Sequence, residues 1–67
     1  MLSARNQFRG AIKSVKLDGV MAEVVVAVGN IEVVSLISRA SAEHLGLKVG
    51  DEVTAVIKAT EVMVAKA

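Results

Sequence analysis

The 67-residue chain contains no cysteine, proline, tryptophan or tyrosine, and it has only one phenylalanine and one histidine. Without cysteine it forms neither disulfides nor thiolate metal sites, and His44 alone cannot build a zinc site. A domain of this size buries only about 60% of its unfolded surface. Such domains usually need a disulfide, a metal or oligomerisation for stability. Oligomerisation is the one of these three aids that remains.

A strong charge of either sign and long apolar runs are also missing. Eight basic and seven acidic residues give a net charge of +1. Nucleic-acid binders that work by electrostatics carry a concentrated basic face, which this balance does not suggest. The longest apolar runs, such as Val24–Val28, are far shorter than the roughly 20 residues that span a bilayer. The N-terminus lacks the apolar core of a signal peptide. We expect a cytoplasmic protein that binds neither nucleic acid nor a membrane.

Aliphatic residues dominate what is present. Hydrophobic residues make up 54% of the chain, and valine, isoleucine and alanine supply most of them. A monomer of this size cannot easily hide so much apolar surface, and large exposed apolar patches usually mark contacts. We therefore expect one domain over residues 1–67 that forms a homo-oligomer.

The apolar residues alternate with a period of two along most of the chain, which predicts β-strands. The expected strands cover about 7–17, 20–28, 31–38 and 53–58, with a short fifth strand over 61–65. Asp18-Gly19 and Gly29-Asn30 predict hairpin turns. A change of parity between Ile12 and Val15 predicts a bulge or bend in the first strand. These features predict a curled antiparallel meander.

One segment between the third and fourth strands breaks the strand pattern. Ser41 is expected to cap a short helix over Ala42–Leu45, with Glu43 in its first turn and Gly46 at its end. The predicted fold class is therefore all-β: a small, oligomeric, OB-like antiparallel barrel of about five strands with one short helical turn.

The residues needed for catalysis are not arranged for it. The carboxylates are scattered over turns and strand ends, and nothing pairs two of them for acid–base chemistry. His44 has no nucleophile beside it, and the five glycines are isolated turn residues rather than a phosphate-binding loop. We predict that the chain is not an enzyme, holds no protein-coordinated metal and needs no cofactor.

Hydrogen-bond donors gather in three clusters at the start, end or break of a strand. They are the segments 3–6 (SARN), 35–38 (SLIS) and 58–60 (KAT). Backbone N–H groups at such places are free of the ladder, and donor-rich concavities hold oxyanions well. Each cluster alone is better explained by ordinary turn chemistry or a solvated lysine.

Three longer segments resemble one protein family. SARNQFRGAI, DGVMAEVVV and VVSLISRASAEHLGLKVGDEVTAVIKATEVMVA are similar to the molbindins, small molybdate-binding proteins built from the TOBE-like Mop domain. The resemblance covers essentially the whole chain. It implies an OB-like barrel that assembles as a hexamer, a trimer of dimers, with molybdate or tungstate bound between subunits.

The resemblance also implies a set of ligand residues. Many relatives have serine where this chain has Ala59, so only a backbone amide is available there. Some relatives have a second class of site, which the resemblance suggests for Val20, Met21, Ala22 and Glu23. The oxyanion ligands would come from the first segment, the last segment and a neighbouring subunit: Ser3, Arg5 and Asn6; Lys58, Ala59 and Thr60; Ser35 and Ser38.

The predicted function is storage, buffering or delivery of the oxyanion inside the cell. One alternative is a module for single-stranded nucleic acid, since OB-like barrels often bind single strands. Such proteins stack bases on aromatic side chains, and only Phe8 is available here. The other alternative is a purely structural assembly module whose bound anions are incidental.

Overall fold

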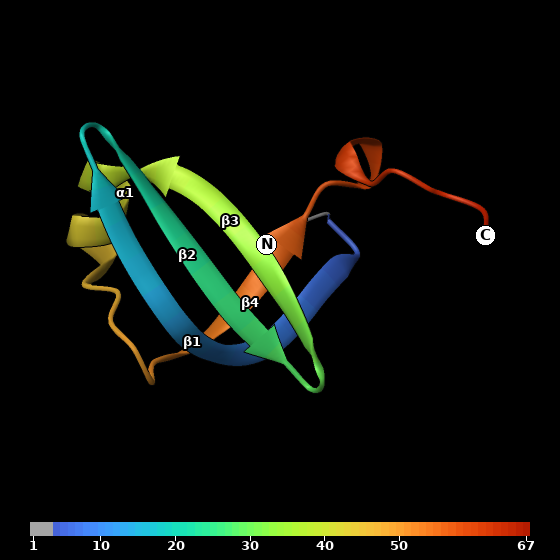
Figure 1. Cartoon of the computed structure of the whole chain (residues 1–67), viewed down its shortest axis with the longest axis horizontal. Coiled ribbons are helices and arrows are strands. Elements are labelled where there is room, and N and C mark those ends of the chain that lie inside the picture. The colour runs from blue at the N-terminus through green and yellow to red at the C-terminus, as the bar shows by residue number, and fades with distance from the viewer. Residues whose placement is uncertain (1–3) are drawn as a thin grey trace.

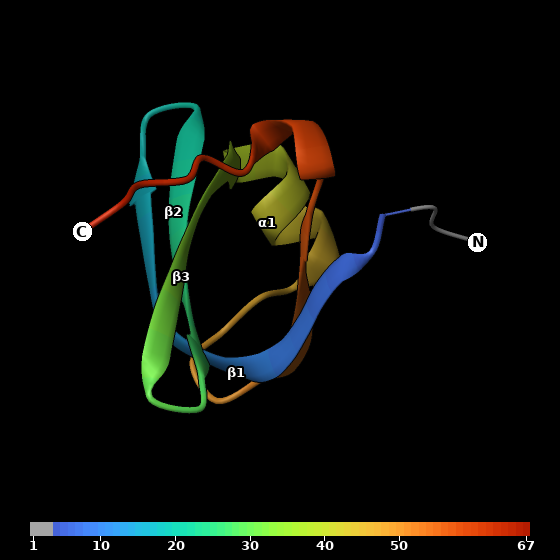
Figure 2. The same ribbon diagram turned by 90° about the vertical axis from the view of Figure 1, so that its right-hand side faces the viewer.

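The computed structural model describes residues 4–67, which form one curled antiparallel sheet with a helix at one end (Figures 1 and 2). The strand order is β3-β2-β1-β4, so β1 pairs with both β2 and β4. The sheet is rolled into a half-barrel that is open between β3 and β4. The elements in chain order are β1 (Asn6–Asp18), β2 (Met21–Val28), β3 (Ile31–Ser38), α1 (Arg39–Leu45), β4 (Glu52–Ile57) and the 3-10 helix η1 (Ala59–Glu61).

The first three strands form a meander because two glycines make tight turns between them. Gly19 and Gly29 have φ angles of 60° and 59°, and each is the first residue of a two-residue connection. Glycine at this place suits the hairpin turns whose twist matches that of the flanking strands. Both predicted turns are confirmed.

A bulge in β1 lets this strand pair with β2 along one half and with β4 along the other. Its register against β2 shifts between Ile12 and Ser14, as the change of parity predicted. The residues after the bulge pair with β2, while those from Asn6 to Ala11 pair with β4. A bulge bends a strand and increases its local twist, so β1 turns the corner between the two sides of the half-barrel.

The core lies inside this curve and consists of small aliphatic side chains. Alternate residues of β2 face it, and Ala22, Val24 and Val26 are 0%, 3% and 4% exposed. Ile12 and Ala42 are buried with them. Further half-buried side chains pack around this core: Val15, Val28, Val33, Ile37, Leu47 and Val53.

The helix begins earlier than the sequence pattern predicts. Ser38, rather than Ser41, is the N-cap, and its Oγ accepts a hydrogen bond from the Ser41 backbone N–H (3.0 Å). Glu43 is therefore outside the first turn, while Gly46 ends the helix as expected, with φ 64°. Two serines three residues apart are equally good caps locally. The end of β3 at Ser38 decides between them.

The fifth strand expected over 61–65 is not formed, so the described residues contain four strands rather than about five. Ala59–Glu61 forms η1 instead, and the residues after it have no strand partner. Met63 and Val64 are each 94% exposed. The 3-10 turn redirects the chain away from the sheet before a fifth strand can pair (Figure 1). Within residues 4–67, no helix has the length and hydropathy needed to cross a membrane.

Candidate functional site

Two of the predicted donor clusters lie side by side at one end of the β1–β4 ladder. The ladder begins with Asn6 opposite Ile57. The two strands are antiparallel, so Arg5, just before Asn6, and Lys58, just after Ile57, lie at the same end of the ladder. The Gln7 N–H donates to the Arg5 carbonyl (3.1 Å), which holds the chain as it enters β1. Figure 1 shows the start of β1 beside the end of β4. Ser3 lies outside the described residues.

The turn that follows β4 adds backbone donors to this end of the ladder. The Glu61 N–H donates to the Lys58 carbonyl (2.9 Å), and the Val62 N–H donates to the Ala59 carbonyl (3.4 Å). Among residues 4–67, no protein acceptor faces the N–H groups of Ala59 and Thr60. Free N–H groups are the normal state of the first turn of a helix. Position 59 thus offers a donor although its side chain has none.

Among residues 4–67, no acidic side chain pairs with the charges at this end. Arg5 and Lys58 are both exposed. Glu61, in η1, is paired with neither of them. Residues 4–67 hold no cluster of three or more acidic or histidine side chains suited to a cation. Two unpaired cations favour an anion here. The ion pairs of the described residues are Lys13–Glu32 and Arg39–Glu43.

Ser35 lies in the groove that separates β3 from β4. This groove has a volume of about 610 Å³ and is lined mainly by aliphatic side chains. Ser35 shares it with Ile57 and Glu61, the residues that flank Lys58–Thr60 in the chain. The structure therefore places Ser35 on the same groove as the end of β4, but it records no contact between Ser35 and the donor clusters.

Ser38 is found at the other end of the sheet. It lies opposite Met21 in the β2–β3 register, and α1, which it caps, lies on the opposite side of the molecule from η1 in Figure 1. Its hydroxyl donates to Ser41 Oγ (2.8 Å). One chain does not bring Ser38 to Arg5 and Lys58. A ligand role for Ser38 stays a prediction that requires a second subunit and the loss of this hydrogen bond.

The segment 20–23, suggested as a second site, surrounds the β1–β2 hairpin turn near Ser38. The Val20 carbonyl accepts a hydrogen bond from the Arg39 N–H (2.8 Å), and the Ala22 side chain is fully buried. Glu23 is half-buried and lies opposite Lys16 in the β1–β2 register. A carboxylate here disfavours an anion unless Lys16 or another cation offsets it. The predicted residues thus form two groups at opposite ends of one chain.

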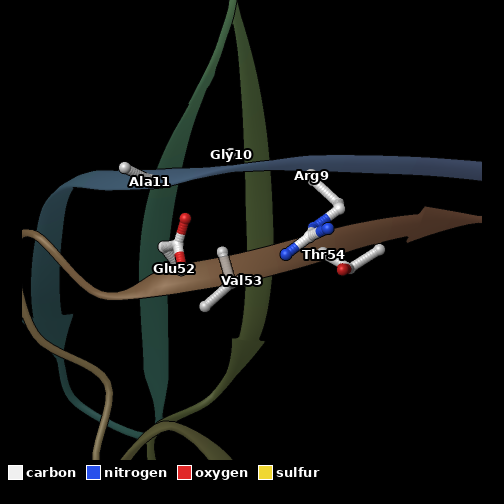
Figure 3. Close-up of a pocket in the computed structure, with 6 residues that line it drawn as sticks. All are labelled: Arg9, Gly10, Ala11, Glu52, Val53 and Thr54. Carbon is white, nitrogen blue, oxygen red and sulfur yellow. The ribbon is translucent and has the colours of Figure 1, made fainter.

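A separate surface pocket of about 460 Å³ lies over the outer side of β1 and β4 (Figure 3). In it the Arg9 guanidinium of β1 lies beside Thr54 of β4. The Glu52 carboxylate projects from β4 further along. A cation and an anion on one shallow surface are poorly suited to a dianion, because the carboxylate repels it. We do not assign this pocket to the oxyanion.

The apolar groove itself is the feature that the sequence pattern misses. The predicted OB-like barrel of about five strands did not include such a groove. A signal was nevertheless present: the sequences of β3 and β4 contain neither lysine nor proline, the residues that commonly protect an exposed edge strand.

Comparisons with known proteins cover nearly the whole chain. The family model of the TOBE domain matches residues 2–64. The chain is 52% identical over 64 residues to molybdenum-pterin-binding protein 3 of Clostridium pasteurianum, and the match covers 94% of each chain.

Two solved structures superpose closely on the half-barrel. A molybdate-binding protein from Sporomusa ovata has a TM-score of 0.94 and 38% identity over 98% of both chains. The cytoplasmic molybdate-binding protein ModG, solved with molybdate bound, has a TM-score of 0.84 and 40% identity. That match covers 88% of this chain and 43% of ModG. These similarities confirm the predicted fold class and family resemblance.

Proposed function

Since the chain belongs to the TOBE-domain family, and within it to the molybdenum-pterin-binding (Mop) proteins, we propose that it binds molybdate or tungstate without catalysing a reaction. The observation that carries this proposal is the meeting of Arg5 and Asn6 with Lys58–Thr60 at one end of the β1–β4 ladder. The similarity to molybdate-binding proteins from Sporomusa ovata and to ModG supports the choice of ligand.

The donor set suits a tetrahedral dianion. At neutral pH the oxygens of molybdate only accept hydrogen bonds. Arg5 and Lys58 supply charged donors, the Asn6 amide and the Thr60 hydroxyl supply neutral ones, and the Ala59 N–H adds a backbone donor. Hydrogen bonds to ionised partners are shorter and stronger than neutral ones. A half-exposed cluster of this composition therefore favours a doubly charged anion over a neutral ligand.

Selectivity among oxyanions follows from the same donors. Hydrogen phosphate carries a proton that needs an acceptor, and Arg5, Lys58 and the backbone N–H groups can only donate, so these ligands disfavour that ion. Sulfate has the same charge and shape as molybdate but is smaller, so only a rigid cavity of fixed size rejects it. Such a cavity requires more walls than this exposed end of one chain provides.

We propose that a neighbouring subunit completes the site. Arg5, Lys58 and Thr60 are exposed in one chain, and the two predicted serine ligands are not brought to them. In this arrangement Ser3, Arg5, Asn6 and Lys58–Thr60 belong to one subunit, while Ser35 and Ser38 belong to another. The assembly is a homo-oligomer, for which a hexamer remains the expectation from the family resemblance.

The proposed role is storage, buffering or delivery of the oxyanion in the cytoplasm, the compartment in which ModG is described. An anion held between subunits stabilises the assembled form, because the unfolded chain does not bind it. The bound anion therefore stabilises the assembled protein, and assembly in turn strengthens anion binding.

Native mass spectrometry of the purified protein tests the proposal. The protein is measured alone and with molybdate, tungstate, sulfate or phosphate, each at the same concentration. We expect an oligomer that takes up a fixed number of molybdates or tungstates and ignores the other two anions. Equal uptake of all four anions, or uptake of none, would contradict the proposed function.

A molybdenum-pterin is a second candidate ligand, because the 52% identical relative is named for binding one. A pterin is a flat ring system that is usually held by stacking or by a deep apolar cleft, whereas the described cluster consists of exposed polar donors. Adding a free pterin to the molybdate titration separates the two ligands. Retention of molybdate without pterin identifies the bare oxyanion as the ligand.

A further inference from the structure

Arg5 and Asn6, two of the predicted ligand residues, lie inside a short turn that a single residue closes. The Gln7 backbone N–H donates to the Arg5 carbonyl (3.1 Å), and a bond of this span defines a γ-turn centred on Asn6. The Gln7 side-chain Nε2 donates to the Ala4 carbonyl (2.6 Å). Gln7 therefore brackets Arg5 and Asn6 with one backbone and one side-chain hydrogen bond.

The side-chain bond depends on the chemistry of glutamine. The Ala4 carbonyl can only accept a hydrogen bond, so the NH2 end of the Gln7 amide must face it. An asparagine is shorter by one methylene, an ionised glutamate has no donor, and a lysine or arginine would add a charge. Position 7 thus supplies a neutral donor on a long side chain.

Gln7 can hold this turn because it is itself part of the sheet. It lies opposite Val56 in the β1–β4 ladder, whereas Asn6 occupies the terminal rung and Ala4 and Arg5 precede that rung. Residues near a chain end fray unless they are tied down. The bonds from Gln7 tie the carbonyls of Ala4 and Arg5 to a residue inside the ladder.

The other half of the candidate site is held in a comparable way. In η1 the Glu61 N–H donates to the Lys58 carbonyl (2.9 Å) and closes the turn that follows β4. Both strands therefore carry, at the same end of the ladder, a short turn that presents hydrogen-bond donors. Backbone bonds close the turn after β4, while the turn before β1 also uses the Gln7 side chain.

Fixing these donors in advance matters because the site is exposed. A free Arg5 backbone would lose conformational freedom each time an anion bound. Holding a binding segment in its bound conformation removes that cost and so improves affinity. The Nε2 donor of Gln7 is already engaged by Ala4, which suits a role in orienting other ligands rather than in binding the anion.

We propose that Gln7 is a positioning residue of the anion site, which holds Arg5 and Asn6 in place for the oxyanion without contacting the oxyanion itself. This inference rests on the proposed function and extends the site to a residue outside the predicted ligand set. Gln7→Met tests it, since methionine keeps the length of the side chain and removes the donor.

Backbone 15N relaxation of the anion-free protein tests the positioning. In the wild-type protein we expect order parameters of about 0.85 for the Arg5 and Asn6 amides, as in rigid backbone, and in Q7M values below about 0.6. The order parameters of Phe8 and the later residues of β1 should not change. Equal values for Arg5 and Asn6 in both proteins would overturn the proposal.

Calorimetric titration with molybdate tests the consequence for binding. We expect Q7M to bind about three- to tenfold more weakly, as the loss of one neutral hydrogen bond predicts, with an unchanged urea midpoint. Thr54→Val removes an exposed polar group from β4 and serves as the control, which should bind like wild type. Normal affinity of Q7M would contradict the proposal.

A double-mutant cycle distinguishes positioning from a merely structural role. If Gln7 acts through Arg5, Q7M should weaken binding by about twofold or less when Arg5→Ala is already present. The full effect in both backgrounds would show that Gln7 acts by another route, and the proposal would be wrong. Absence of molybdate binding in the wild-type protein would refute the proposed function and the role of Gln7 together. Normal wild-type binding with an unaffected Q7M would refute the role of Gln7 alone.

Discussion

Gly10 lies directly against the carbonyl oxygen of Ala27, and a Cβ atom on Gly10 would overlap this oxygen. It would also lie 3.0 Å from side-chain carbons of Val26 and Val28. The obstacle is backbone, which cannot rotate away. We expect Gly10→Ala to lower the free energy of unfolding by about 1–3 kcal/mol, as overpacking does. Urea unfolding measures this, with Ala11→Ser as an exposed control that changes it by less than about 0.5 kcal/mol. Equal stability of G10A and wild type would contradict the close approach.

Lys58→Ala should weaken molybdate binding while leaving the fold intact. Lys58 is exposed and pairs with no acidic side chain of residues 4–67, so its removal does not disturb the sheet. A hydrogen bond to a charged partner contributes about 1.5–3 kcal/mol, which corresponds to roughly tenfold or more in affinity. Calorimetric titration measures the loss. Lys48→Ala removes the same charge from the exposed loop between α1 and β4 and serves as the control. An equal loss in both variants would point to net charge rather than to a ligand contact.

Thr60→Val should weaken molybdate binding about three- to tenfold, because it replaces a hydroxyl donor by a methyl group of the same size. Thr60→Ser retains the hydroxyl and should bind nearly as well as wild type. The Thr60 side chain is exposed, so neither change should move the unfolding midpoint by much. If T60S loses as much affinity as T60V, the hydroxyl does not contact the anion.

Ser38→Ala should destabilise the protein by about 1 kcal/mol through loss of the helix cap. In this variant the Ser41 N–H loses the side-chain acceptor that it has in the wild-type protein. Ser41→Ala keeps that acceptor and is expected to cost less in urea unfolding. Molybdate titration of folded S38A then shows whether Ser38 also binds the anion. Normal affinity in S38A would remove it from the predicted ligand set.

The protein should have no stable folded monomer. Five residues form the fully buried set of the described chain: Ile12, Ala22, Val24, Val26 and Ala42. So small a core supports a domain of this size poorly. The unfolding temperature should therefore fall as the protein is diluted, and molybdate should raise it. A folded monomer at micromolar concentration in sedimentation, with an unfolding temperature independent of dilution, would contradict this.

Local sequence signals predict the meander well because each is decided by neighbouring residues. The hairpin glycines and the bulge after Ile12 depend on turn and strand chemistry within a few positions. The helix start is less predictable from sequence, since Ser38 and Ser41 are both competent caps and only the end of β3 selects the first. The fate of residues 61–65 is harder to predict, because alternation favours a strand but does not reveal that η1 includes Glu61 and turns the chain away from the sheet.

The candidate site could be predicted from sequence in pieces but not as a whole. Strand order brings Arg5 and Asn6 to Lys58–Thr60, and that order requires the β1–β4 ladder. Ser35 and Ser38 are three residues apart on one strand, so alternation predicts opposite faces, but only the fold shows their different neighbours. Ser38 is also the N-cap of α1, so the sequence alone does not show whether this serine is a helix cap, an anion ligand or both.

The bulged strand β1 has a consequence for how the molecule opens. In the described chain, β4 is hydrogen-bonded into the sheet only through the half of β1 that precedes the bulge. Asn6 begins that half and Arg5 directly precedes it, while Lys58–Thr60 directly follow β4. Fraying of these six rungs therefore releases both sides of the candidate site together, while the β2–β3 hairpin remains. We therefore expect the candidate site and its supporting ladder to open together, at a lower free energy than global unfolding.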